Sequence, residues 1–272
     1  MRVACIQPQI FQDRKKCYLQ IKSLLEQLLK KNKNCDIACL PERWVPFSRD
    51  PLKNIQDERG LDYNYIKNLA KEFNIKILSG GIWEKRNKSD KPVITCYFFD
   101  ENGEEIGRQE KIHLYAYEKE QFLPGKDLKI FKLNQLFNFA ILICFDMAFF
   151  ETPRLAVENG ADVLFSPTLI REDGMINWEI YLKARALENR VPIVACNPFG
   201  KYQKRNFLGY SKIISFYKGN VSPSKLRIIE GPKNASGFIY DEIDLSFPKK
   251  MRKIRLGEKI DKNKINIKII NK

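Results

Sequence analysis

The sequence predicts a layered α/β fold with mixed β-sheets. Strands and helices alternate from residue 2 to residue 83, and they alternate again from residue 139 to residue 196. Between these two series lies a β-hairpin around the turn Glu101-Asn102-Gly103. Hydrophobic residues make up 44% of the 272 residues, which is enough to build a sizeable core.

Each expected element rests on a local pattern. Arg14–Lys31 has apolar side chains at helical spacing and a lysine-rich opposite face. The helix Thr152–Asn159 has Pro153 in its first turn and Gly160 after its end. The other expected helices are Asp62–Phe73 and Gly174–Asn189. The expected strands are Arg2–Gln7, Cys35–Leu40, Ile75–Trp83 with an interruption at Gly80 and Gly81, Val93–Phe99, Glu105–Glu110, Phe139–Ile143, Asp162–Ser166, Pro192–Cys196, Lys212–Phe216, Lys225–Ile229 and Gly237–Asp241.

We expect one domain, residues 1–248, followed by a basic tail, residues 249–272. The formal net charge is +15, and the tail carries ten Lys/Arg against Glu258 and Asp261, which is +8. Elsewhere the basic residues are interspersed with acidic ones. Biased composition and a solvated tail therefore explain the charge better than a nucleic-acid site does. The rival interpretation is a non-catalytic protein whose tail binds RNA or an acidic partner in a salt-sensitive way.

Cysteine and histidine usage restricts the chemistry further. The seven cysteines match no disulfide framework or zinc motif, and Cys5, Cys39, Cys96 and Cys196 lie in apolar, strand-like segments where we expect them to be buried. The single histidine, His113, excludes a site with several histidine ligands. A hydrolase built from this sequence would use a carboxylate as its base and a lysine as its cation. We expect neither a metal nor a cofactor.

No apolar run is long enough to span a bilayer, and the first residues do not form a signal peptide. We therefore expect a cytoplasmic protein with no membrane partner.

Three reactive side chains lie at the ends of predicted strands or follow them closely. Glu42 comes after Leu40-Pro41, Lys111 after the strand that ends at Glu110, and Cys144 after the apolar run 139–143. Each would be unremarkable alone, but a thiol at neutral pH needs a base to remove its proton or a cation to lower its pKa. Lys111 can also stabilise negative charge on a tetrahedral intermediate. Together the three residues predict a cysteine nucleophile.

The segments that hold these residues resemble the three catalytic blocks of the nitrilase superfamily, the carbon–nitrogen hydrolases. The resemblance continues after the cysteine and covers roughly residues 1–241 in the family's order. The segments that carry it are Val3–Gln7, Leu40–Glu42, Lys111–Tyr115, Cys144–Arg154, Gly160–Leu164, Ser166-Pro167, Trp178, Arg185-Ala186, Glu188-Asn189 and Asn197.

The resemblance implies a role for each matching residue. Glu42 would be the general base, Lys111 the oxyanion-stabilising lysine and Cys144 the nucleophile. Glu118 matches the second glutamate, which orients the lysine and helps to place the substrate; Glu120 is the alternative for this role.

Other parts of the family's pattern concern the surroundings of these groups. The backbone N–H of Phe145 would complete the oxyanion hole, and His113 would be a positioning residue. The family fold is a four-layer αββα sandwich with two mixed sheets. It usually forms dimers through the helices after the nucleophile, so we expect a homodimer or a larger homo-oligomer.

The implied reaction is hydrolysis of a small amide through a thioester on Cys144, with release of ammonia. Asp146 resembles the amidase and carbamoylase branches, so N-carbamoyl amine hydrolysis is the next alternative and nitrile hydrolysis a more distant one. We expect Arg43, Trp44, Met147 and Arg171 to line the substrate site. Basic residues there would suit a carboxylate-bearing substrate, such as an ω-amide of a dicarboxylic acid.

Overall fold

The computed structural model describes residues 1–45, 51–86 and 89–270. Eight strands of this structure form a first mixed sheet: β1 (Arg2–Gln7), β2 (Ile37–Cys39), β3 (Gln56–Asp57), β4 (Lys76–Leu78), β5 (Ile82–Lys85), β6 (Val93–Phe99), β7 (Glu105–Glu110) and β16 (Gly237–Glu242). Their order is β16-β1-β2-β4-β6-β5-β3, with β7 paired to β6. The strands β1, β2 and β4 are parallel, while β16 and β6 run antiparallel beside them.

The second sheet contains β8 (Ile130–Lys132), β9 (Asn138–Ile141), β10 (Val163–Pro167), β11 (Ile193–Cys196), β14 (Lys212–Phe216) and β15 (Leu226–Glu230). Its order is β15-β14-β11-β10-β9-β8, and its centre, β9-β10-β11, is parallel. A separate hairpin joins β12 (Phe199–Tyr202) to β13 (Arg205–Leu208). The parallel strands of both sheets matter for function, because ligands bind beyond the carboxyl ends of such strands.

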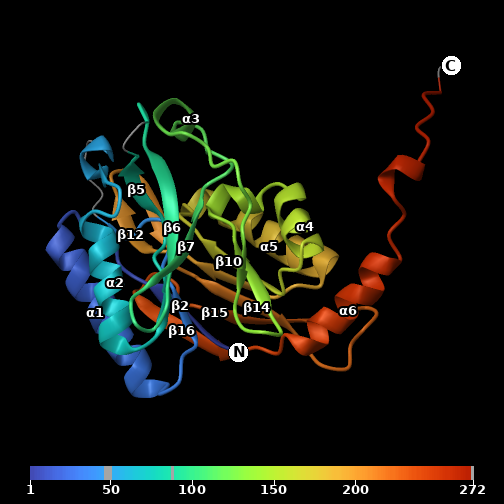
Figure 1. Cartoon of the computed structure of the whole chain (residues 1–272), viewed down its shortest axis with the longest axis horizontal. Helices are drawn as coiled ribbons and strands as arrows, with labels where there is room; N and C mark the ends of the chain where they lie inside the picture. The colour runs from blue at the N-terminus through green and yellow to red at the C-terminus, as the bar shows by residue number, and fades with distance from the viewer. Residues whose placement is uncertain (46–50, 87–88, 271–272) are drawn as a thin grey trace.

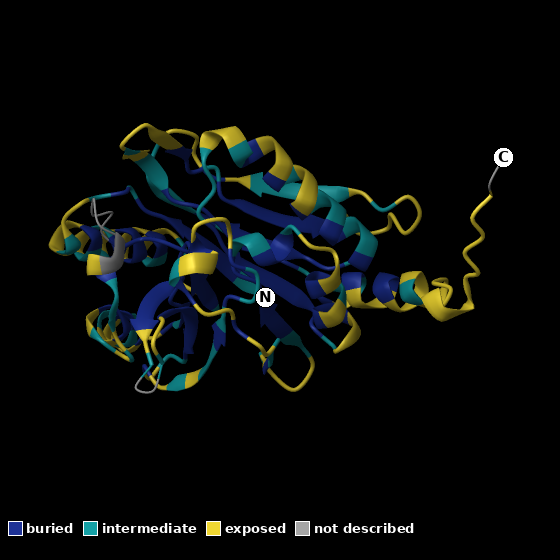
Figure 2. Ribbon diagram, turned by 90° about the horizontal axis from the view of Figure 1, so that it is seen from above, coloured by how far each residue is buried: buried dark blue, intermediate teal, exposed yellow. Residues whose placement is uncertain are grey.

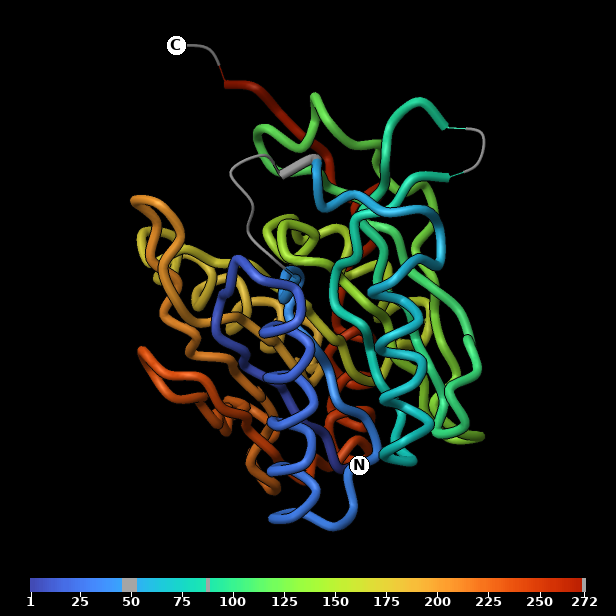
Figure 3. Tube along the Cα trace, turned by 90° about the vertical axis from the view of Figure 1, so that its left-hand side faces the viewer, coloured from blue at the N-terminus to red at the C-terminus, as the bar shows by residue number. Residues whose placement is uncertain are grey.

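Helices cover the outer faces of the two sheets (Figure 1). The helices α1 (Arg14–Lys31) and α2 (Leu61–Phe73) lie side by side on the first sheet and face the viewer in Figure 3. The second sheet is covered by α4 (Glu151–Glu158) and α5 (Met175–Asn189). The remaining helices are α3 (Glu118–Gln121) and α6 (Ser246–Gly257), and single 3₁₀ turns span Pro51–Asn54, Cys144–Met147, Glu172–Gly174 and Lys262–Lys264.

Alternating side chains produce this layering. In β1, Val3 and Cys5 point into the core between the two sheets, whereas Ala4 and Ile6 point into the core beneath α1 and α2. A third apolar core lies between the second sheet and the helices α4 and α5. Three cores separate four layers, so the predicted αββα sandwich is confirmed, and the buried interior is continuous across it (Figure 2).

Most predicted elements are present with nearly the expected bounds. The segment 75–83 is two strands rather than one, because Gly80 has a φ of +69° and turns the chain between β4 and β5. The strands β3 and β8, the hairpin β12–β13 and the helices α3 and α6 were not predicted. The four cysteines expected in strands are all fully buried.

The expected boundary at residue 248 falls inside α6. Met251 and Arg252 of this helix are buried, and the Arg252 guanidinium pairs with the buried carboxylate of Asp162. Lys249 Nζ lies 3.1 Å from the same carboxylate. The first part of the segment expected as a tail is thus bound to the second sheet, and the exposed extension that leaves the body begins only after Gly257 (Figures 1 and 2).

Among the described residues, no helix combines the length and the apolar character needed to cross a membrane.

Candidate active site

Glu42 stands three residues beyond the end of β2, where the backbone is fixed on both sides. Its N–H donates to Thr168 O at 3.0 Å, which joins the end of the first sheet to the end of the second. Gly81 packs directly against it, since a Cβ there would lie 2.4 Å from Glu42 O. The glycine pair between β4 and β5 therefore positions the glutamate, and the Glu42 side chain is buried.

Lys111 is the centre of the polar groups in the site. It directly follows β7, its N–H donates to Ile94 O at 2.9 Å, and its side chain is fully buried. The ammonium lies 2.5 Å from Glu42 Oε1 and 2.9 and 2.7 Å from the two carboxylate oxygens of Glu118. Glu118 begins α3 and also accepts the N–H of Tyr115 at 2.7 Å. One ammonium thus bridges two buried carboxylates.

The structure distinguishes the two glutamates that were candidates for this second position. Glu118 is buried against Lys111, whereas Glu120 is exposed on the other side of the same short helix. The geometry therefore places Glu118, and not Glu120, beside the lysine.

Cys144 opens the 3₁₀ turn that follows β9, and its φ is +49°. Such a left-handed conformation is uncommon for a residue other than glycine, and it costs conformational energy. Asp146 holds the turn, because its buried carboxylate accepts the N–H of Ile143 at 2.9 Å and the N–H of His113 at 2.7 Å. The turn leaves the thiol half-buried at the surface of the site.

His113 belongs to this support and does not contact the reacting groups. Its Nδ1 lies 3.0 Å from Asp146 Oδ1, and its ring stacks on Phe149 with 4.4 Å between the centroids. Through Asp146 it connects the loop after Lys111 to the turn of Cys144. The arrangement agrees with the positioning role expected for His113.

The charges of the site act on one another. Burial raises the pKa of the Cys144 thiol well above its usual value, and the Glu42 carboxylate raises it further, against the opposing effects of Lys111 and a hydrogen bond from the Leu169 backbone. Burial also raises the pKa of Glu118, with Lys111 opposing it. Burial disfavours the charge of Lys111, but Glu42, Cys144 and Glu118 nevertheless raise the pKa of its ammonium well above the normal value. The site therefore holds a protonated thiol beside a permanent cation.

Of the residues expected to line the site, Arg43 is close enough to Glu42 and Glu118 for both carboxylates to act on its charge. Its guanidinium stacks 3.9 Å above the ring of Trp83, and only 4% of the residue is exposed. The ring of Phe145 packs edge-on against Tyr115 and Phe149 at 5.1 Å, beside the nucleophile turn.

The other three expected lining residues have different surroundings, and their contact with substrate stays a prediction. Trp44 points into the core beneath α1 and α2, where its indole N–H donates to Ser79 O at 2.7 Å. Met147 is buried in the core under α4 and α5. Arg171 is partly exposed and pairs with Asp173 at 3.1 Å. Trp44 and Met147 thus pack in apolar cores, while Arg171 lies at a partly exposed position.

Sequence reasoning missed three residues beside the site. Tyr117 immediately precedes α3, Tyr202 ends β12, and Leu169 follows β10. Both tyrosines act electrostatically on Arg43, and Leu169 hydrogen-bonds the Cys144 thiol. Only the position of Leu169 after a predicted parallel strand could have indicated it.

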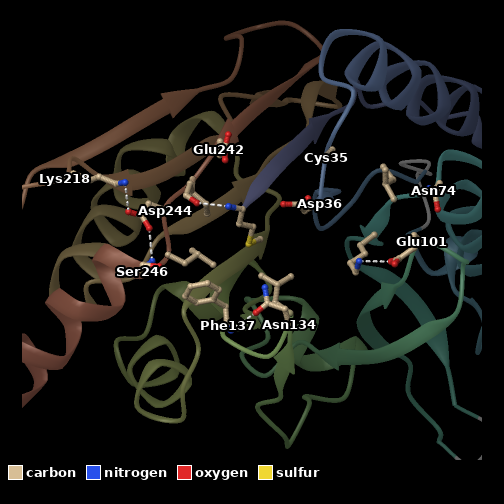
Figure 4. A pocket seen from close by; sticks show the side chains of 16 residues that line it. Cys35, Asp36, Asn74, Glu101, Asn134, Phe137, Lys218, Glu242, Asp244 and Ser246 are labelled. Carbon is tan, nitrogen blue, oxygen red and sulfur yellow. Dashed lines mark hydrogen bonds and ion pairs between the residues drawn. The ribbon is translucent and has the colours of Figure 1, made fainter.

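No group of three or more His, Cys, Asp or Glu in the described part of the chain is arranged to hold a metal ion. A cavity of about 870 Å³ lies at the other end of the sheets, among residues such as Met1, Asp36 and Lys76 that precede or begin strands (Figure 4). Lys76 pairs there with Glu101 at 2.7 Å. None of the catalytic candidates lines this cavity, so it is separate from the active site.

The chain is similar over most of its length to known proteins of one family. The model of the carbon–nitrogen hydrolase family matches residues 2–253. The probable nitrilase C965.09 of Schizosaccharomyces pombe is 29% identical over 260 residues, which cover 92% of this chain and 91% of that protein. The 2-oxoglutaramate amidase of Bacillus subtilis is 30% identical over 220 residues, covering 79% and 81%.

A solved structure shows the same fold. The crystal structure of Nit3 from Saccharomyces cerevisiae, described as a member of branch 10 of the nitrilase superfamily, matches with a TM-score of 0.83 and 23% identity over 97% of each chain. With the family match over nearly the whole sequence, the predicted resemblance is confirmed. The chain belongs to the carbon–nitrogen hydrolase family.

Proposed function

We propose that the chain hydrolyses a small amide through a thioester on Cys144, with Glu42 as general base and Lys111 as the cation that stabilises the oxyanion. The observation that supports this most is the Lys111 ammonium, which joins Glu42 to Glu118 beside a thiol of raised pKa. A thiol that is protonated at rest needs a base at the moment of attack, and a buried carboxylate provides one.

The reaction proceeds in two balanced steps. In the first, Sγ of Cys144 bonds to the amide carbon, its proton passes to Glu42, and the C–N bond breaks as Glu42 protonates the leaving ammonia. In the second, Glu42 takes a proton from water as the water oxygen attacks the thioester carbon, and the C–S bond then breaks as Glu42 returns that proton to Sγ. Lys111 and the N–H of Phe145 stabilise the negative oxygen in both steps.

Glu118 serves as the positioning residue for Lys111. Both of its oxygens accept from the ammonium, and the N–H of Tyr115 fixes the carboxylate in turn. A long, flexible lysine side chain is thereby held in one orientation before substrate arrives.

The substrate class follows from chemistry and from similarity together. The relative from Bacillus subtilis is a 2-oxoglutaramate amidase, and at 30% identity it favours an amide over a nitrile. Asp146 is engaged with Ile143 and His113, so in this structure it supports the turn and does not separate amides from N-carbamoyl amines.

The test is ammonia release from a panel of ω-amides, simple amides, N-carbamoyl amines and nitriles. The wild-type protein should act best on amides, and Cys144→Ala should keep its circular dichroism spectrum and melting temperature while losing activity by at least about 10³-fold. An unchanged rate in this variant, or a preference for nitriles, would contradict the proposal.

We propose further that the protein is a homodimer and works in the cytoplasm. Large apolar side chains stand exposed on and beside the helices that follow the nucleophile: Phe150, Leu155, Ile176 and Ile180. All seven cysteines are free thiols, which suits a reducing compartment. Sedimentation of the purified protein and fractionation of its native cells test the two statements; a monomer at micromolar concentration would contradict the first.

A further inference from the structure

The short segment 168–170, just beyond the end of β10, contacts two of the reacting groups through its backbone. Thr168 O accepts the N–H of Glu42 at 3.0 Å, and the backbone of Leu169 hydrogen-bonds the Cys144 thiol. These residues belong to no helix or strand. Something other than regular secondary structure therefore has to keep the segment in one position.

The side chain of Asn197 makes the contacts that hold this segment. Asn197 directly follows β11 and is fully buried. Its Oδ1 accepts the N–H of Ile170 at 2.7 Å, and its Nδ2 donates to Ile170 O at 3.3 Å and to Gly209 O at 2.8 Å. The amide thus pairs with both backbone polar groups of Ile170, as a neighbouring strand would do within a sheet.

Asn197 is itself fixed by the end of the second sheet. Its N–H donates to Ser211 Oγ at 2.9 Å, and the Ser211 hydroxyl donates to Asn197 O at 3.2 Å. The Thr168 hydroxyl donates to Cys196 O at 2.7 Å and lies 3.4 Å from Asn197 Oδ1. A buried polar cluster therefore connects the ends of β10 and β11 to the segment that contacts Glu42 and the thiol.

We propose that Asn197 is a positioning residue for the reaction: its amide fixes the segment 168–170, which holds Glu42 and Cys144 in place relative to each other. This inference rests on the proposed function, in which Glu42 takes the proton of the Cys144 thiol. Asn197 acts through the backbone of the segment and takes no part in the bonds that form or break. A misplacement of about 1 Å between reacting groups can cost roughly 10²-fold in rate.

The variant Asn197→Leu tests this role, because it keeps the size of the side chain and removes its hydrogen bonds. The rate of Cys144 alkylation by iodoacetamide at pH 8 should fall at least about fivefold, since the Leu169 hydrogen bond favours the thiolate. For amide hydrolysis, kcat should fall at least about tenfold and KM should change less than about threefold. A purely structural role would lower the melting temperature and leave both rates of the folded protein unchanged.

The matched control is Asn189→Leu. Asn189 is also a fully buried asparagine, and its Nδ2 donates to Arg185 O at 3.0 Å within α5. Both variants should melt at lower temperatures than the wild type, but only Asn197→Leu should lose alkylation rate and kcat when both are assayed where they are folded. Equal losses in the two variants, or wild-type rates in Asn197→Leu, would overturn the inference.

Alkylation also separates this inference from the proposed function, because it needs the thiol and no amide substrate. If the wild type releases no ammonia from any amide, the proposed function fails, and an alkylation rate in Asn197→Leu equal to that of the wild type refutes the positioning of Cys144 independently. Amide hydrolysis at the wild-type rate by Asn197→Leu leaves the amidase standing and refutes the role of Asn197. If Asn197→Leu does not fold, Asn197→Ser and Asn189→Ser replace the pair, with the same outcomes required.

Discussion

Removing the charge of Lys111 should expose how strongly the two carboxylates of the site depend on it. Lys111→Met keeps a chain of similar length but deletes three charged contacts of 2.5, 2.7 and 2.9 Å. Glu42 and Glu118 would then face each other in a buried site with no cation between them. Breaking a buried ion pair by removing one partner costs about 3–5 kcal/mol of unfolding free energy.

The cost should depend on pH in a definite direction. Without Lys111, burial and mutual repulsion raise the folded-state pKa of the carboxylate pair above the unfolded value of roughly 4.3. The variant therefore loses little stability below that value, and the loss grows as pH rises through the raised folded-state pKa. At about 2–4 °C per kcal/mol for a chain of this size, the melting temperature at pH 8 should fall by roughly 6–20 °C.

Urea unfolding at pH 5 and pH 8 measures this effect, and ammonia release measures function. Activity should fall by at least about 10²-fold, the usual loss for one oxyanion donor. Adding Glu118→Gln to Lys111→Met should restore much of the stability, because it removes one of the two facing charges, and none of the activity. If Lys111→Met is as stable as the wild type at both pH values, the ammonium does not stabilise the two buried carboxylates against their mutual repulsion.

Two further predictions concern the thiol and the C-terminal helix. The rate of Cys144 alkylation by iodoacetamide, followed by mass spectrometry, should still increase above pH 9 because the pKa of the thiol is raised. Cys144 in Glu42→Gln should be alkylated severalfold faster at pH 8, and this variant should release no ammonia. A rate that stops increasing below pH 7 would contradict the raised pKa. Arg252→Met should destabilise the fold by about 3 kcal/mol because it strips the buried Asp162 of its guanidinium, whereas the exposed Arg255→Met should change thermal stability by less than about 0.5 kcal/mol. Equal melting temperatures for these two variants would mean that α6 is not bound to the fold through Asp162.

The fold was predictable where the spacing of apolar residues in the sequence matches the face that an element buries. The bounds of α1, Arg14–Lys31, were predicted to the residue, because its buried side chains repeat at helical spacing along one face. The helix α6 was missed for the opposite reason. Its many lysines and arginines resemble a solvated tail, and only the distant Asp162 shows why Arg252 is buried.

The site residues could be predicted from the sequence only where a reactive side chain follows a predicted strand. Glu42, Lys111 and Cys144 each lie within three residues of the end of a strand, and the structure brings the three together. The environment of Arg43 could not be predicted in this way. Trp83, Tyr117 and Tyr202 reach it from three separate parts of the chain, and the hairpin that carries Tyr202 has no strong turn signal.

The proposed mechanism gives a reason for two carboxylates to share one ammonium, starting from the raised pKa of Cys144. A thiol that is neutral at rest has to transfer its proton during the attack, and the proposed acceptor is Glu42. Once Glu42 is protonated, its attraction for the Lys111 ammonium weakens, while Glu118 still accepts from the ammonium through both oxygens. The ammonium then has one negatively charged carboxylate beside it instead of two. In the proposed mechanism the ammonium would then be available to the oxyanion at the moment when negative charge appears there.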